Sequence, residues 1–335
     1  MQTLPAAHPT RPAFARVWWV SPKLDAMSAP HEGLTLCIDA GQTGIRAQLR
    51  NSVHRGSSLE FPGIRNDLPP LPQLADVVRR TIGETRQQAT VVALGSSGLE
   101  SAEPGALLAM VEELGVRQTL LAHDSITSYL GALGARRGAV IAAGTGVVTL
   151  AVGVDRVARV DGWGYLLGDA GSGFWVGRAA LDQVMRAYDG RGPQTALTEI
   201  VSRDFADLSE AYREVQEDPR KVSRIAGYAK VVAGLAETDQ VCHEILTAAA
   251  NELVHSVVSG LERVGEPRAP RTAVCTVGNM FRSSLLATTF CDSLRRRAPQ
   301  ATMLPPAGNA LDGAYALTTL TEDSALWGEV LRGGD

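Results

Sequence analysis

Two stretches of the sequence, far apart along the chain, resemble each other. Residues 38–44 read Ile-Asp-Ala-Gly-Gln-Thr-Gly, and residues 141–146 read Ile-Ala-Ala-Gly-Thr-Gly, one residue shorter. Each is typical of a strand, a turn rich in glycine and threonine, and a second strand. Such internal similarity predicts two related domains that each offer one turn to the same ligand. The alternative is that both are ordinary hairpins with glycine turns.

The rest of the chain alternates between strand and helix patterns, which predicts an α/β fold. We expect a mostly parallel sheet with helices on its faces, and chemistry at the carboxyl ends of its strands. The elements that the pattern predicts are strands at 34–39, from 45, at 90–94, 118–122 and 272–277, with helices at 71–86, 125–133, 173–188 and within 195–265.

Length and composition narrow the class of protein. The 335 residues exceed the length of about 250–300 at which single hydrophobic cores stop growing, so two domains are expected. A net charge of −4 argues against a nucleic-acid surface. No apolar run is long enough to span a membrane.

Residues 1–32 lack periodicity and are predicted to be a disordered leader. The four cysteines are scattered, as expected for buried thiols in a reducing cytoplasm, and form no metal-ligand set.

The glycine-rich turns fit the binding of phosphate groups. Glycine lets backbone N–H groups approach phosphate oxygens closely, and a nest of such amides attracts anions. Two turns with threonine hydroxyls are suited to gripping a triphosphate from both sides. Asp39, at the end of the first strand, is suited to holding Mg²⁺ through water. No lysine follows any glycine turn, which excludes a P-loop.

Asp124 is the candidate general base. It follows a strand and opens a predicted helix, where a carboxylate can accept the proton of a substrate hydroxyl. The competing interpretation is that Asp124 is only a helix N-cap, a position that Asp often fills. Asp169 has the same alternative, as a simple turn or cap residue.

Several motifs, taken in order, carry a resemblance to a known family. They are Ile38–Thr43, His123-Asp124-Ser125, Ala143–Gly146, Gly162-Trp-Gly-Tyr-Leu-Leu-Gly-Asp-Ala-Gly-Ser-Gly173, Val277-Gly278-Asn279 and Asn309–Ala314. Together they resemble the N-acetylglucosamine kinases and the BadF/BadG/BcrA/BcrD-type ATPases, within the actin-like sugar-kinase superfamily. The resemblance spans about residues 34 to 320, and the stretch 162–173 is its most specific part.

The resemblance implies two actin-like ATPase domains with a nucleotide and sugar cleft between them. It implies an N-terminal domain of residues 33–137 plus 311–335 and a C-terminal domain of residues 138–310. It also implies an ATP-dependent, Mg²⁺-requiring kinase that phosphorylates the 6-hydroxyl of an amino sugar, most simply N-acetylglucosamine or glucosamine. A cytoplasmic homodimer with a small-molecule sugar as its partner is expected.

The resemblance also assigns roles to individual residues. Asp124 is expected to be the general base and Asp39 to organise Mg²⁺. The residues expected to bind the nucleotide are Gly41, Gln42, Thr43, Gly144, Thr145, Gly146, Gly278 and Asn279. Those expected at the sugar are Asn66, Asp124, Thr145, Gly146, Gly162 and Asp169.

Four places depart from the family's usual pattern. Ala40 stands where glycine is usual, Gly44-Ile45 where a polar pair usually follows Thr43, Val147 where serine is common, and Ala170 where glutamate is usual. These changes lie at the phosphate and sugar loops. Two other functions therefore stay open beside the kinase. One is a BadF/BadG-type ATPase that activates an iron–sulfur dehydratase, and the other is a sugar-binding regulator of the same fold without turnover.

Overall fold

A computed structural model describes residues 33–65, 67–99, 102–103, 105–266 and 272–334. The predicted leader, residues 1–32, and the candidate sugar contact Asn66 lie outside the described residues.

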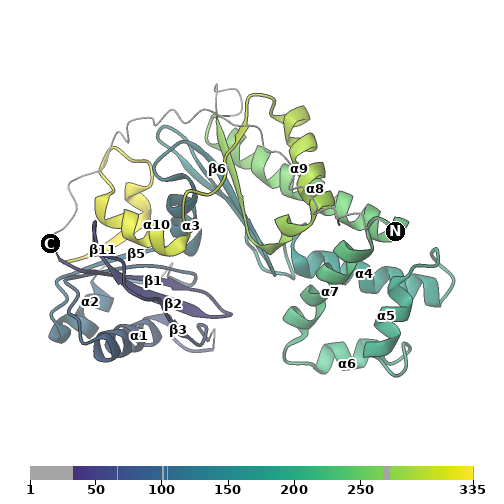
Figure 1. The fold of residues 1–335 in the computed structure, drawn as a ribbon, viewed down its shortest axis with the longest axis horizontal. Helices are drawn as coiled ribbons and strands as arrows, with labels where there is room; N and C mark the ends of the chain where they lie inside the picture. The colour runs from purple at the N-terminus through teal and green to yellow at the C-terminus, as the bar shows by residue number, and fades with distance from the viewer. Residues whose placement is uncertain (1–32, 66, 100–101, 104, 267–271, 335) are drawn as a thin grey trace, which may run out of the picture.

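Two β-sheets form the frame of the molecule (Figure 1). The first has the order β11-β5-β4-β1-β2-β3, and the second has the order β10-β9-β6-β7-β8. The strands of the first sheet are β1 (Thr35–Ala40), β2 (Ile45–Arg50), β3 (Leu59–Phe61), β4 (Val91–Ser96), β5 (Gln118–Ala122) and β11 (Val330–Gly333). Those of the second are β6 (Gly138–Ala143), β7 (Val147–Val152), β8 (Val157–Asp161), β9 (Ala273–Val277) and β10 (Thr302–Met303).

The two sheets repeat one topology. Read from the third strand of each, β3-β2-β1-β4-β5 corresponds to β8-β7-β6-β9-β10. In both, the first two strands form an antiparallel hairpin, and the first strand then pairs in parallel with the fourth. The two similar glycine turns are the tips of the corresponding hairpins. The prediction of two related domains is therefore confirmed.

The expectation of a mostly parallel sheet was wrong, because both sheets are mixed. In the first sheet β1/β4 and β4/β5 are parallel, whereas β1/β2, β2/β3 and β11/β5 are antiparallel. For the hairpin β1/β2 the physical reason is the short connection between the two strands. Strands joined by a tight turn pair antiparallel, and only a long crossover allows parallel pairing.

The helices lie close to where the sequence pattern predicts them. They are α1 (Pro70–Thr85), α2 (Ala106–Val111), α3 (Asp124–Leu133), α4 (Gly173–Tyr188), α5 (Leu197–Asp204), α6 (Ala211–Glu217), α7 (Lys221–Leu235), α8 (Gln240–Arg263), α9 (Ser284–Arg297) and α10 (Ala310–Ala316). Short 3-10 turns are η1 (Glu112–Leu114), η2 (Asn279–Arg282), η3 (Leu317–Thr319) and η4 (Trp327–Glu329).

Helix α3 lies between the two sheets. Its buried side chains Ile126, Tyr129 and Leu130 belong to one hydrophobic cluster with Ala122 of the first sheet and Val140 of the second. Figure 1 shows α3 and α10 together in this position. The N-terminus of α3, which carries Asp124, is therefore fixed to both halves of the molecule.

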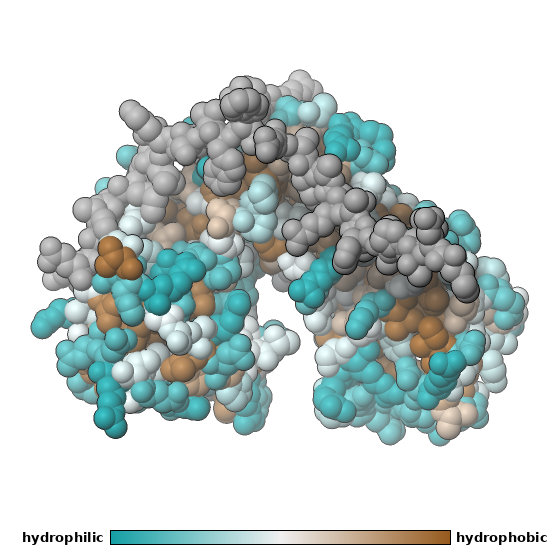
Figure 2. All heavy atoms as spheres, in the orientation of Figure 1, coloured by the Kyte–Doolittle hydropathy of each residue, from teal (hydrophilic) through white to brown (hydrophobic). Residues whose placement is uncertain are grey.

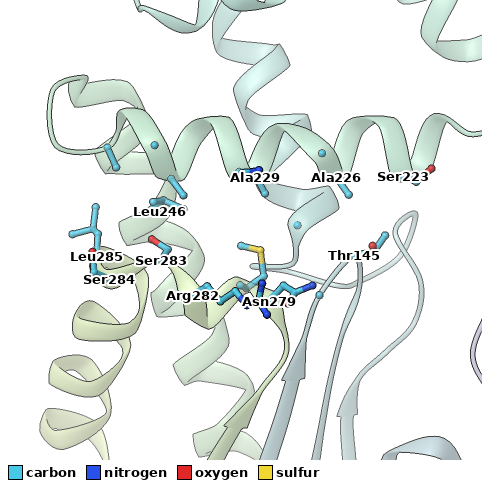
Figure 3. A pocket seen from close by; sticks show the side chains of 18 of the residues that line it. Thr145, Ser223, Ala226, Ala229, Leu246, Asn279, Arg282, Ser283, Ser284 and Leu285 are labelled. Carbon is cyan, nitrogen blue, oxygen red and sulfur yellow. The ribbon is translucent and has the colours of Figure 1, made fainter. Parts of the chain in front are cut away.

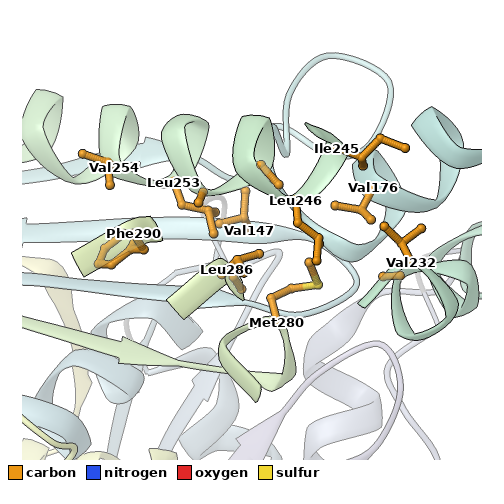
Figure 4. Packing of buried hydrophobic residues seen from close by; sticks show 14 of the residues in the cluster. Val147, Val176, Val232, Ile245, Leu246, Leu253, Val254, Met280, Leu286 and Phe290 are labelled. Atoms are coloured by element: carbon orange, nitrogen blue, oxygen red, sulfur yellow. The ribbon is translucent and has the colours of Figure 1, made fainter. Parts of the chain in front are cut away.

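The largest hydrophobic cluster lies in the second half, between its sheet and the helices α4, α7, α8 and α9. In Figure 4, Leu246, Leu253 and Val254 of α8 face Val147 of β7 and Phe290 of α9. The long apolar face of α8 supplies much of this core, as expected for a helix that lies across a sheet.

A deep notch separates two lobes in the space-filling view (Figure 2). One lobe carries the hairpin strands β1–β3, and the other carries helices α4–α7 (Figure 1).

Among the described residues, no helix is long and apolar enough to cross a bilayer. The chain returns to the first sheet at its end, where β11 pairs with β5. The exact domain boundaries stay a prediction.

Candidate active site

The carboxyl ends of three parallel strands meet at one edge of the first sheet. Asp39 of β1 lies opposite Gly95 of β4, and Gly95 lies opposite Ala122 of β5. Asp124 follows two residues after Ala122. Gly95 has no side chain because a Cβ there would lie 2.0 Å from the Thr127 hydroxyl of α3. The sheet edge therefore brings Asp39 and the start of α3 into one region.

The β1–β2 turn presents an exposed tip. The amide of Gly41 donates to the Gly44 carbonyl at 3.1 Å, and the amide of Ile64 donates to the Gly41 carbonyl at 3.0 Å. Between these anchors Gln42 and Thr43 are exposed. This arrangement fixes the turn and leaves its tip accessible to a ligand.

The β6–β7 turn is fixed by the N-terminus of α4. The Gly144 carbonyl accepts from the amide of Gly173 at 2.7 Å, and the Thr145 carbonyl accepts from the amide of Phe174 at 3.1 Å. The Gly144 amide donates to the Gly146 carbonyl at 2.9 Å and closes the turn. Because a helix N-terminus carries a partial positive charge, anionic groups are favoured near this turn.

Asp161 organises the glycine-rich loop, a role that the sequence analysis missed. Its Oδ1 accepts from the amides of Gly162 at 2.9 Å and Asp169 at 2.7 Å, and its Oδ2 accepts from the amide of Ala170 at 3.1 Å. One carboxylate thus joins the two ends of the loop. An Asp-Gly pair after a strand is a turn signal, and it was the local sign available in the sequence.

Asp169 lies inside this loop and contacts the second turn. Its side chain is buried, and a Cβ on Gly146 would lie 2.6 Å from its Oδ2. Burial, and then the charge of Asp161, raise the pKa of Asp169, although hydrogen bonds from the backbone of Gly164 and Val147 oppose the shift. Asp169 therefore links the glycine-rich loop to the β6–β7 turn, and this structural role is separate from its predicted contact with the sugar.

The chemistry of Asp39 fits a water-held Mg²⁺. Its side chain is 20% exposed and pairs with Arg46 of β2, the residue directly opposite in the register, at 2.6 Å. Among the residues that the structure describes, no three His, Cys, Asp or Glu side chains form a group that could hold a metal. Mg²⁺ commonly binds through one or two carboxylates together with substrate phosphates and water. Asp39 lies beside the exposed β1–β2 turn, so one carboxylate next to a turn with free backbone would match that mode.

Asp124 is not the N-cap of α3, so the cap interpretation was wrong. The N-cap residue is His123, with φ −61° and ψ 144°, and Asp124 is the first residue of the helix. Its side chain is 35% exposed, and its Oδ1 lies 2.9 Å from Nδ1 of His123. A carboxylate that caps no backbone amide and stays accessible is suited to accepting a proton.

A cavity of about 730 Å³ opens beside the β6–β7 turn (Figure 3). Helix α7 forms one wall with small residues, among them Ala226 and Ala229, and the segment from Asn279 to Leu285 forms the opposite wall. Gly144 and Thr145 lie at its edge. Flat walls of small residues suit a planar base, and the volume is typical of a small-molecule site.

Gly278 allows the turn after β9 to pack closely behind the cavity wall that begins at Asn279. Its φ is 103°, and a Cβ there would lie 2.1 Å from the Ala143 carbonyl oxygen. No side chain fits without moving the backbone. The turn after β9 is thereby pressed against the end of β6, and Asn279 enters the cavity beside Gly144.

The structure thus groups the predicted residues into two sets. Gly144, Thr145 and Asn279 line the cavity. Asp39 and Asp124 belong to the edge of the first sheet. The sequence analysis gave no role to five residues that pair with or lie beside the predicted ones: Arg46, His123, Arg159, Asp161 and Lys230.

The repeated sheets, the glycine turns and the cavity between α7 and η2 define a two-domain α/β protein of the actin-like ATPase class. Residues 41–314 match the BadF/BadG/BcrA/BcrD ATPase family. The chain belongs to this family, and the expected resemblance is confirmed.

Two sugar kinases, going by their names, are similar to this chain in sequence. The N-acetyl-D-glucosamine kinase of Dictyostelium discoideum is 30% identical over 244 residues, which cover 68% of this chain and 75% of that protein. The N-acetylmuramic acid/N-acetylglucosamine kinase of Clostridium acetobutylicum is 24% identical over 244 residues, which cover 70% of this chain and 79% of that protein.

A solved structure shows the same fold. It comes from Chromobacterium violaceum, where its assignment as an N-acetylglucosamine kinase is provisional. The TM-score is 0.65 at 24% identity, and the match covers 85% of this chain and 99% of the other. This likeness supports the two-domain actin-like architecture.

Proposed function

We propose that this chain is an ATP-dependent sugar kinase that phosphorylates the 6-hydroxyl of an amino sugar, N-acetylglucosamine or glucosamine. The observation that carries the proposal is the accessible Asp124 carboxylate at the edge of the first sheet. Asp39 lies at that same edge. Two sequence relatives act as kinases of N-acetylated sugars, which supports the same substrate class.

The residues have complementary roles in this reaction. Asp124 accepts the proton of the sugar hydroxyl, whose oxygen forms a bond to the γ-phosphorus. The bond from that phosphorus to the bridging oxygen breaks, and ADP leaves with the electron pair. The backbone of the Gly41–Gly44 and Gly144–Gly146 turns holds the phosphates. Asp39 would hold Mg²⁺ through water, and the bound ion would supply positive charge beside the phosphates.

The cavity beside the second turn suits the nucleoside. Ala226, Ala229 and Asn279 line it, and Gly144 and Thr145 join it to the phosphate turn. Lys230 and Arg282 add positive charge to its walls. The sugar then lies toward Asp124, with Gly146, Gly162 and Asp169 on the side of the second domain.

The iron–sulfur alternative has little support from the described residues. Cys37, Cys242 and Cys275 are buried free thiols. Burial raises the pKa of Cys37 to about 12 and that of Cys275 to about 11, which disfavours the thiolate that a cluster needs.

The sugar is identified by measuring ADP release with a panel of amino sugars and hexoses. Release that depends on N-acetylglucosamine or glucosamine, with phosphate found at the 6-position, supports the proposal. Release without any sugar identifies an ATPase, and sugar binding without release identifies a regulator. N-acetylmuramic acid belongs in the panel because the C. acetobutylicum relative acts on it by name.

Asp124→Asn tests the base. Asn keeps the size of the side chain but accepts a proton poorly, so turnover is expected to fall by about 10²–10⁴-fold. The melting temperature is expected to stay near the parent's, because Asp124 caps no amide and a carboxylate in a first helical turn contributes only about 0.3–1 kcal/mol. Phosphorylation at the parent rate by a folded variant contradicts the mechanism.

A further inference from the structure

The guanidinium of Arg46 lies at the candidate Mg²⁺ carboxylate, and the proposed reaction gives it no role. Its Nη2 donates to Oδ2 of Asp39 at 2.6 Å. The two residues are directly opposite each other in the register of β1 and β2. Side chains so placed project from the same face of a sheet. Arg46 therefore lies on the same face of the sheet edge as Asp39.

Arg46 is also close to the exposed β1–β2 turn. It is the second residue of β2 and follows Thr43, at the tip of the turn, by three positions. Its side chain is 46% exposed, and among the described residues its ion-pair partner is Asp39 alone. A long side chain held by one pair and little packing is able to turn toward a group that binds at the neighbouring turn.

A bound nucleotide would compete with this pair on both sides. Asp39 is suited to holding Mg²⁺ through water, yet one of its oxygens already accepts from Arg46. Phosphate oxygens accept two parallel N–H groups of a guanidinium, and such bonds are strong. A half-exposed arginine–carboxylate pair, by contrast, is weak and is exchanged easily. Phosphate at this turn is therefore a better partner for Arg46 than Asp39 is.

We propose that Arg46 is a phosphate-binding residue that exchanges Asp39 for the nucleotide. In the free protein, the Asp39 carboxylate holds the guanidinium beside the turn. When a nucleotide binds, Arg46 turns to its phosphate groups and leaves the Asp39 carboxylate available to metal-bound water. The inference rests on the proposed function, in which the β1–β2 turn holds phosphate. It gives the first domain a charged contact with the nucleotide in addition to the backbone amides of its turn.

Calorimetric binding of ATP and of adenosine tests the contact. Arg46→Met removes the charge, so ATP is expected to bind about 10–100-fold more weakly, whereas adenosine is expected to bind as in the parent because the cavity is unchanged. Arg186→Met is the matched control, since Arg186 of α4 is 41% exposed and pairs with Asp182 at 2.7 Å. It is expected to change neither affinity. Normal ATP binding by Arg46→Met overturns the proposal, and so does an equal loss for adenosine.

Arg46→Lys separates charge from the presence of a long side chain. Lysine keeps the positive charge but lacks the planar pair of N–H groups. Its affinity for ATP is expected to lie between those of the parent and of Arg46→Met. A lysine variant that binds ATP no better than Arg46→Met overturns the proposal.

A structure of the parent with Mg²⁺ and a non-hydrolysable ATP analogue gives a readout that is independent of affinity and of turnover. The Arg46 guanidinium is expected to lie within hydrogen-bond distance of a phosphate oxygen and to have left Asp39. Two other arrangements overturn the exchange. In one the guanidinium stays on Asp39, and in the other it moves to Glu60, the residue opposite Arg46 on β3.

The proposed function and this inference fail in different ways. A parent protein that releases no ADP in response to any sugar of the panel overturns the proposed function. A parent that does release ADP with sugar, together with an Arg46→Met variant that binds ATP normally, overturns only the role of Arg46.

Discussion

At the scale of single residues, the carboxylates of the site differ in what holds them. Asp39 pairs with one exposed arginine, Asp124 with a histidine ring, and Asp161 with three backbone amides. The first two are accessible to a ligand. The carboxylate of Asp161 is occupied by backbone amides of its own loop, so it affects the site only by fixing the conformation of that loop.

Asp161→Ala is expected to destabilise the protein by about 2–4 kcal/mol. It removes three hydrogen bonds to a charged acceptor, and it places alanine at φ 63°, where a side chain costs about 1–2 kcal/mol. Asp161→Asn is the matched variant, because Asn tolerates this backbone and keeps one acceptor oxygen. Urea unfolding is expected to rank the parent above Asn and Asn above Ala. Equal stability of all three contradicts this account of the loop.

The residues that the sequence analysis identified were those whose chemistry is local. A glycine turn or an aspartate after a strand carries its signal within a few positions. Arg46, His123 and Arg159 were missed because their roles depend on strand register and on contact between the two sheets. No local pattern specifies either.

At the scale of elements, α3 is positioned by close packing on α10. A Cβ on Gly313 would lie 1.7 Å from the Thr127 carbonyl oxygen, and one on Gly131 would lie 2.0 Å from that of Asn309. The two helices approach so closely because both glycines lack side chains. This contact fixes the helix that begins with Asp124.

Gly313→Ala is expected to destabilise the protein by about 1–3 kcal/mol, the typical cost of overpacking, and to lower kcat by moving α3. Gly83→Ala is the matched control on α1, where no atom lies within 4 Å of the added Cβ. There alanine is expected to stabilise by about 0.5–1 kcal/mol. Thermal unfolding and initial rates measure both. Opposite signs are expected, and the same sign for both variants contradicts the packing argument.

The first turn of α10 is held by an ion cluster that responds to acid. Asp312 accepts from Arg50 at 2.7 Å and from Arg55, and it forms a capping box with Asn309. Burial alone would raise the pKa of Asp312. The hydrogen bonds from Arg50 and from the Asn309 amide and the charges of Arg55 and Arg50 outweigh it, so the pKa lies below its usual range.

Because the folded pKa is lowered, the stability that this carboxylate contributes is present above the unfolded value of about 3.9 and is lost as pH falls through the folded value. With a side chain 21% exposed, Asp312→Asn is expected to cost about 1–2 kcal/mol at pH 7. The gap between parent and variant is expected to shrink below about pH 4. Urea unfolding from pH 7 downward measures it, and a constant gap contradicts the assignment.

Element types were predictable and their pairing was not. Hydrophobic patterns placed β5 at 118–122 and α4 up to Tyr188 as the structure has them. The three-residue strand β3 was missed because so short a segment has no period. The hairpin pairs β1/β2 and β6/β7 are antiparallel because short turns join them, and β11 adds a further antiparallel pair by returning to β5 from the far end of the chain. Alternation of strands and helices therefore overestimated the share of parallel pairs.

At the scale of the whole molecule, two short similar stretches predicted the repeated architecture. The match was informative because both stretches occupy the same hairpin of the same strand order. The placement of the two sheets relative to each other could not be predicted from the sequence. They follow from α3, whose apolar side chains are buried against both.

We expect the notch between the lobes to narrow when sugar and nucleotide bind together (Figure 2). Closing the site excludes water, which limits hydrolysis of ATP without transfer. Small-angle scattering is expected to show a smaller radius of gyration with both ligands than with either alone. The Asp124→Asn variant, which is expected to turn over slowly, allows both ligands to stay bound during the measurement. An unchanged radius at saturation contradicts the closure.

The return of the chain to the first sheet has a consequence for biosynthesis. Helix α10 and strand β11 come after every strand of the second sheet, yet they pack on α3 and pair with β5. A ribosome therefore finishes the second domain before it supplies the last parts of the first. Until residues 310–333 have been made, the nascent chain holds Asp124 on a helix that lacks its neighbour α10, so a chain cut short before them is expected to have no competent site.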